Sequence, residues 1–230
     1  IENNLQEFGH ITQQSLQWFA SESKRLFHNT DKAVLATFGG TAFGDIALVP
    51  APWLKNPRGI RDVEEWYISI LLRRNYVYKV FEKQCEIALS NLEKLYQAIG
   101  ENIAAVFLTG TDFGTQTGLF ISPKIYCDLY KPFHKTINDW IHKNTGWKCF
   151  MHSCGAVIEL IPYFIEAGFD ILNPVQCSAK GMVPELLKKK FGSQLTFWGA
   201  GVDTQNTLAF GTPVQVREEV LKRIEIFNVN

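Results

Sequence analysis

His152 and Cys154 stand two positions apart, with Gly155 directly after them. Residues 147–151 form an apolar, aromatic run after an Asn-Thr-Gly turn signal at 144–146, which predicts a short buried strand. Gly155 and the apolar residues after it predict the start of a helix, so both side chains lie on a strand-to-helix turn. In parallel α/β folds such turns lie at the carboxyl edge of the strands, where sites are built. An imidazole and a thiolate at that edge favour a soft or borderline metal ion.

A third candidate ligand, Cys177, lies in a loop of the same kind one repeat later. Two thiolates and one imidazole suit Zn²⁺, and a catalytic zinc site needs three protein ligands and one open position. The residue types therefore predict a zinc site made of His152, Cys154 and Cys177. The competing interpretation is structural, because a buried histidine or cysteine is often only a packing residue.

Two carboxylates and three amides also lie in loops that follow predicted strands. Asp112 is a candidate catalytic residue, as a general acid or base or as an anchor for a cationic or NH-bearing substrate. Asp203 is the second catalytic candidate. Each aspartate could instead hold its own loop through an Asx-turn. Substrate-binding and loop-holding roles are expected of Gln116, Gln176 and Gln205.

Five short apolar segments are predicted to be strands, and most are followed by a predicted helix, which is typical of a parallel βα architecture. No Gly-x-Gly-x-x-Gly motif follows any of them, which disfavours a dinucleotide-binding sheet. A (β/α)₈ TIM barrel fits better, although a barrel needs eight strands and about 250 residues. The chain is therefore expected to be one incomplete α/β barrel domain over residues 1–230, lacking N-terminal and C-terminal strands. The predicted strands are Ala33–Phe38, Ile103–Leu108, Trp147–Met151, Phe169–Leu172 and Leu195–Trp198.

Helices are expected around these strands. Residues 1–28 are predicted to be mostly helical, whereas the Pro- and Gly-rich residues 41–59 predict a long loop beside a cleft. A helix is also expected over residues 155–167, kinked or split by Pro162. Helix N-caps are expected at Asp62, Ser122 and Thr212.

Composition excludes several classes of function. The 23 basic and 23 acidic residues balance, and no Lys/Arg block is present, so a nucleic-acid partner is not expected. No apolar run reaches the roughly 20 residues that span a bilayer. The 5 cysteines are odd in number and scattered, which favours a reducing cytoplasm over a disulfide framework. The chain begins with Ile1, so residues are expected before it, and a homodimer is compatible with these totals.

Three segments occur in an order and spacing that resemble the uroporphyrinogen decarboxylase (URO-D) superfamily. They are Thr-Asp-Phe-Gly-Thr-Gln at 111–116 with Ile-Ser-Pro at 121–123, His-Ser-Cys-Gly at 152–155, and Gly-Ala-Gly-Val-Asp at 199–203. The resemblance covers about residues 60–230. It implies a (β/α)₈ barrel with a deep funnel at the carboxyl ends of the strands.

The branches of that superfamily imply different chemistry. In the methyltransferase branch a His-x-Cys turn, matched by His152 and Cys154, binds zinc with a later cysteine, and a zinc-held thiolate takes a methyl group from cobalamin or a corrinoid protein. The family's third cysteine would fall near or just beyond Asn230. Cys177 comes earlier in the chain, so its place as third zinc ligand is inferred from geometry and not from the resemblance. True decarboxylases need no cofactor and use an aspartate to hold a tetrapyrrole, but their N-terminal Arg-rich signature is not in this sequence. A zinc- and corrinoid-dependent methyltransferase is the first expectation; the alternatives are a uroporphyrinogen decarboxylase and a non-catalytic tetrapyrrole-binding barrel.

Overall fold

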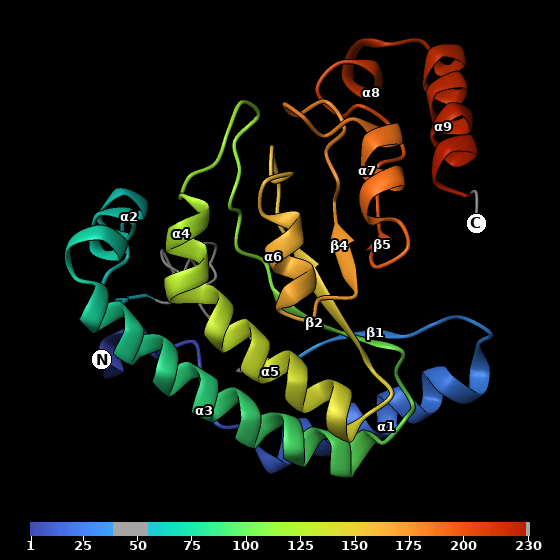
Figure 1. Cartoon of the computed structure of the whole chain (residues 1–230). Helices are drawn as coiled ribbons and strands as arrows, with labels where there is room; N and C mark the ends of the chain where they lie inside the picture. Colours follow the sequence, from blue (N-terminus) through green and yellow to red (C-terminus); the bar gives the residue numbers. More distant parts are fainter. Residues whose placement is uncertain (39–54, 229–230) are drawn as a thin grey trace.

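Five parallel strands form one sheet in the computed structural model, which describes residues 1–38 and 55–228 (Figure 1). Neighbouring strands pair in sequence order, each pair in parallel. All five predicted strands are confirmed within one or two residues of their expected ends. The strands are β1 (Leu35–Thr37), β2 (Ala105–Thr109), β3 (Lys148–His152), β4 (Ile171–Asn173) and β5 (Thr196–Phe197). This sheet is consistent with part of a TIM-barrel-like fold, and closure into eight strands stays a prediction.

The two faces of the sheet pack into separate apolar clusters. Val106 and Cys149 belong to the main core, which the helices cover. Phe150 and Ile171, on the alternate face, form a second cluster with Ala105. Successive side chains of a strand point to opposite faces, so a strand covered on both sides is apolar throughout. The continuous apolar run of β2 follows from this double burial.

The register of the strands sets which side chains meet at the carboxyl edge. His152 at the end of β3 pairs with Asn173 at the end of β4. The register between β2 and β3 shifts between Phe107 and Thr109, just before the loop that carries Asp112. The loops after β2, β3 and β4 therefore leave the sheet side by side.

Three helices are held at their starts by the predicted caps. The side chains of Asp62, Ser122 and Thr212 accept hydrogen bonds from backbone N–H groups in the first turns, and Thr212 forms a capping box with Gln215. The main helices are α1 (Gln13–Asn29), α2 (Val63–Leu72), α3 (Arg74–Ile99), α5 (Lys131–Asn144), α6 (Ile161–Glu166), α7 (Pro184–Phe191) and α9 (Pro213–Phe227). Short turns of helix are η1 (Glu2–Asn4), α4 (Pro123–Ile125), the π-helical η3 (Tyr126–Tyr130) and α8 (Thr207–Phe210).

Two predicted helices are shorter than expected. Within residues 1–28, regular α-helix begins only at Gln13, because the buried Asn91 of α3 binds the backbone of the preceding segment and keeps it out of the helix. Its amide donates to Gly9 O at 2.9 Å and accepts from Ile11 N at 2.8 Å. The helix expected over 155–167 begins at Ile161, and Pro162 lies in its first turn, where its missing N–H costs nothing.

No helix in the part of the chain that the structure describes is long and apolar enough to cross a bilayer. The loop predicted for residues 41–59 falls mostly outside the described residues.

Candidate metal centre

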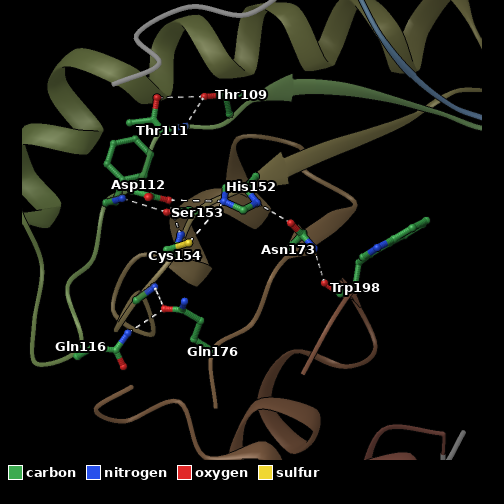
Figure 2. Close-up of polar contacts among 12 residues, drawn as sticks. Thr109, Thr111, Asp112, Gln116, His152, Ser153, Cys154, Asn173, Gln176 and Trp198 are labelled. Carbon is green, nitrogen blue, oxygen red and sulfur yellow. Dashed lines mark hydrogen bonds and ion pairs between the residues drawn. The ribbon is translucent and has the colours of Figure 1, made fainter. Parts of the chain in front are cut away.

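Three donor side chains from two loops converge at the carboxyl edge of the sheet (Figure 2). Their potential ligand atoms, from Asp112, His152 and Cys154, all lie within 4.8 Å of one another. His152 Nε2 lies 3.5 Å from Cys154 Sγ and 3.8 Å from Asp112 Oδ1. Asp112 follows β2, and the other two end and follow β3. All three residues are half-buried.

The orientation and protonation of His152 follow from a chain of hydrogen bonds. Asn173 Nδ2 donates to Trp198 O at 2.9 Å, which turns Asn173 Oδ1 toward His152 Nδ1 at 2.5 Å. An amide oxygen only accepts, so Nδ1 carries the proton and donates. In the neutral tautomer that this bond selects, Nε2 presents its lone pair toward Cys154 and Asp112. This is the tautomer and orientation of a histidine that ligates through Nε2.

Asp112 organises the turn after β3 as well as offering an oxygen ligand. Its Oδ1 accepts from Cys154 N at 2.7 Å. Ser153, between the two donors, is buried, and its hydroxyl accepts from Phe113 N at 3.0 Å. The two loops are thus fastened by reciprocal bonds, one from each side chain to the other loop's backbone.

The thiol of Cys154 is neutral when no cation is bound. Burial and the neighbouring Asp112 carboxylate together raise the pKa of Cys154 to about 12. A cation bound here reverses this balance, because a metal-bound thiol loses its proton. Without a cation, Cys154 is therefore not a thiolate nucleophile near neutral pH.

The donor set fits zinc by type and by spacing. Sulfur, nitrogen and carboxylate oxygen are the three ligand atoms that Zn²⁺ takes in proteins. A tetrahedral ion with ordinary bond lengths separates sulfur and nitrogen ligands by about 3.6 Å, and nitrogen and oxygen ligands by about 3.4 Å. The corresponding separations here are 3.5 Å and 3.8 Å. The sulfur–nitrogen separation agrees with the tetrahedral value, and the nitrogen–oxygen separation exceeds it by a few tenths of an ångström.

Close backbone contact locks the turn that carries Cys154 against the loop after β2. Gly155 has φ +86°, and a Cβ on it would lie 2.3 Å from Gly114 O. Ala156 N donates to Thr115 O at 2.8 Å across the same contact. Only glycine combines a left-handed φ with so close an approach.

The amides predicted to bind substrate hold the loops together. Gln176 Oε1 accepts from Gly155 N at 2.8 Å and from Gln116 Nε2 at 3.1 Å (Figure 2). Three loops, after β2, β3 and β4, therefore meet at one amide oxygen. The expected loop-holding role is thus visible for both glutamines, and contact with a substrate stays a prediction.

The structure does not bring Cys177 to the other two predicted zinc ligands. It is absent from the donor group, and its Sγ contacts Val175 O at 3.6 Å. Burial raises the pKa of Cys177 to about 11, and its charged neighbours are those of α7, α9 and the loop after β5. The third donor beside His152 and Cys154 is instead Asp112, because the β2 and β3 loops adjoin.

Asp203 also lies apart from this group and binds its own loop. Its carboxylate accepts from Gln205 N at 2.8 Å, Asn206 N at 3.3 Å and Asn206 Nδ2 at 2.8 Å. Hydrogen bonds, chiefly from Asn206, lower the pKa of Asp203. This arrangement matches the Asx-turn interpretation, and a catalytic role stays a prediction. Gln205 is exposed beside it.

Two residues of the site were not singled out in the sequence. Asn173 orients His152, and the register of β4 against β3 is the signal that could have found it. Tyr67 of α2 stacks on Phe120 at 5.3 Å and points its hydroxyl toward Asp112 O at 3.5 Å. Burial, together with the Asp112 charge, raises the pKa of Tyr67, which is therefore a neutral phenol at one side of the site.

A second His-Cys-Asp group occurs at the opposite edge of the sheet, and its carboxylate already bonds protein groups. Asp170 Oδ2 accepts from Cys149 N at 2.7 Å and lies 2.8 Å from His142 Nε2. Since the carboxylate engages the imidazole nitrogen directly, this group ties the start of β4 to α5 and β3.

Comparison with known proteins gives a likeness of fold. No protein-family model matches the chain. No curated protein matches it either. A solved methyltransferase from Methanosarcina mazei superposes with a TM-score of 0.56 over 96% of this chain and 68% of that chain, at 9% sequence identity. At this identity the likeness shows a shared α/β fold.

Proposed function

We propose that this chain is a methyltransferase of the URO-D superfamily type, with a zinc ion held by Asp112, His152 and Cys154. The observation that carries the proposal is the convergence of these three donors around the Nε2 lone pair of His152. The fold likeness to a methyltransferase supports the same reaction class. The sequence resemblance around residues 152–155 and 199–203 supports the superfamily.

Zinc bound there would lower the pKa of a substrate thiol and hold it as a thiolate, the nucleophile for a methyl group. Three protein donors leave a fourth position for that thiol. The methyl donor in this proposal is a corrinoid, either free cobalamin or a corrinoid carried by a partner protein.

The chain's own residues prepare this position. Asn173 keeps the proton of His152 on Nδ1, so Nε2 stays available as a ligand. Asp112 supplies a negative charge and fixes the backbone of Cys154. Gly155 and Gln176 hold the turn at a fixed distance from the neighbouring loops. The donors are thus positioned before any cation arrives, which reduces the ordering entropy lost on binding.

Zinc content of the purified chain, prepared without chelators, tests the proposal. We expect about one zinc per chain, the stoichiometry of a single three-donor site. Cys154→Ser should lose the metal, because the serine hydroxyl replaces the soft sulfur ligand. Cys177→Ser is the matched control and should retain it, because Cys177 lies outside the donor group.

Retained zinc in Cys154→Ser, or loss in Cys177→Ser alone, would contradict this ligand set. Conversion of uroporphyrinogen by zinc-free protein would instead select the decarboxylase reaction. Methyl transfer to a thiol from methylcobalamin, dependent on zinc, is the activity to assay.

A further inference from the structure

A pocket of about 240 Å³ lies between the loops after β4 and β5, outside the donor group. Its walls are formed by residues 174–178 and by residues 199–202 and 204. Pro174 directly follows Asn173, which orients His152. Gln176, another wall residue, accepts from Gly155 N beside Cys154. The pocket is therefore built from the same loops that position the proposed metal centre.

The shape of this pocket is set by tight backbone packing of its two loops. Ala200 N donates to Pro174 O at 3.0 Å. Gly199 has φ +131°, and a Cβ there would lie 1.9 Å from Pro174 O. Val175 and Ala200 have φ of 58° and 59°, in the left-handed region that such residues rarely adopt. Side chains are held in that region where the surrounding packing imposes it, commonly at ligand-binding sites.

The walls carry no charge. The lining consists of apolar side chains, three neutral polar ones, Gln176, Ser178 and Thr204, and the thiol of Cys177. Charged groups lie behind the walls without lining the pocket. Asp203 accepts hydrogen bonds from Asn206, Gln205 and the wall residue Ser178, and Arg223 Nη2 pairs with Glu219 at 2.9 Å. An ionic ligand group would lose its hydration in this pocket and gain no charged partner from the lining. An uncharged group does not have this cost.

We propose that this pocket binds the uncharged, mainly apolar part of the substrate, a group about the size of one six-membered ring. An apolar cavity of about 150 Å³ is enough to bind benzene, so 240 Å³ accommodates a ring with a small substituent. The proposal rests on the proposed function and deepens it. The pocket selects the body of a small neutral substrate while the metal centre engages its reacting group.

Cys177 reports occupancy of the pocket. Its thiol is half-buried in the wall and lies outside the donor group. The test measures the rate at which iodoacetamide labels Cys177 at mildly alkaline pH, by mass spectrometry of its peptide. Two single-ring probes of similar size, neutral anisole and anionic benzoate, are compared. At about nine times its dissociation constant, anisole should slow labelling about tenfold, because a bound fraction of about nine tenths shields the thiol.

Benzoate should leave the labelling rate unchanged. Equal protection by both probes, or by neither, overturns the proposal. Val202→Trp, which fills the pocket from its wall, should abolish protection by anisole. Val214→Trp is the matched control, since Val214 is 63% exposed on α9 and lies outside the pocket, and it should keep full protection.

Zinc binding measured on the same samples separates the two proposals. Zinc without anisole protection overturns the pocket assignment and leaves the metal centre intact. Anisole protection without zinc leaves a neutral-ligand pocket and overturns the methyltransferase that it was proposed to serve.

Discussion

Asn173 faces His152 across neighbouring strand ends, with 2.5 Å between Oδ1 and Nδ1. The other end of the same amide donates to Trp198 O on β5's exit, so the loops after β3, β4 and β5 form one chain of bonds. This relationship decides which nitrogen of the imidazole can ligate a cation, and it gives the first prediction.

Asn173→Ala should weaken zinc binding about 10- to 100-fold, the usual cost of removing a partner that orients a ligating histidine. Asn173→Asp keeps an oxygen acceptor for Nδ1 and should stay near the wild-type affinity. Competition with a chromophoric chelator measures both. A wild-type affinity in Asn173→Ala would show that His152 needs no such partner.

Gly155→Ala should destabilise the chain by at least about 1–3 kcal/mol, because alanine is strained at a left-handed φ. The added Cβ would also meet the Gly114 carbonyl at 2.3 Å. Gly118→Ala in the neighbouring loop after β2 is the control, because nothing lies within 4 Å of its added Cβ. Urea unfolding of the two variants measures the difference, and equal midpoints would refute the close approach.

Gln176→Ala should speed amide hydrogen exchange at Gly155, whose N–H donates to Gln176 Oε1. Loss of one hydrogen bond, worth about 0.5–1.5 kcal/mol, corresponds to roughly a two- to tenfold faster exchange. Gln205→Ala provides the comparison, because Gln205 is exposed in a different loop. If both variants exchange alike at Gly155, the junction of three loops at Gln176 does not stabilise the turn.

His134 should make the chain sensitive to acid. Burial lowers the pKa of His134 to about 3 from its ordinary value near 6.5, and its Nδ1 lies 3.1 Å from the Tyr126 hydroxyl. His134 therefore binds a proton in the unfolded chain at pH values where it stays neutral in the native chain. The free energy of unfolding falls as pH drops below about 6.5 and continues to fall toward pH 3.

From pH 6.5 to 5 this histidine should remove about 2 kcal/mol from the free energy of unfolding. Over the same pH interval, the free energy of unfolding of His134→Gln should fall by about 2 kcal/mol less than that of the wild type. Urea unfolding at the two pH values checks this. Parallel pH profiles for the two proteins would mean that His134 is protonated in the native state.

The positions of most elements could be predicted from local signals. Five apolar runs became the five strands, and Asp62, Ser122 and Thr212 cap helices, because these signals act over a few residues. Segments whose conformation depends on a distant partner could not be predicted. Residues 8–12 stay outside the helix because Asn91, far along the chain, binds the backbone of Gly9 and Ile11.

For the site, the sequence alone determined that His152 and Cys154 share one turn, because two positions on a strand-to-helix connection cannot separate. Only the tertiary structure decided their third companion. Spacing along the chain pointed to Cys177, whereas pairing of β2 with β3 brings Asp112 to the donors, and Cys177 stays outside the donor group. The physical reason is that neighbours at a sheet edge are set by strand order and register, which involve residues about 40 positions apart.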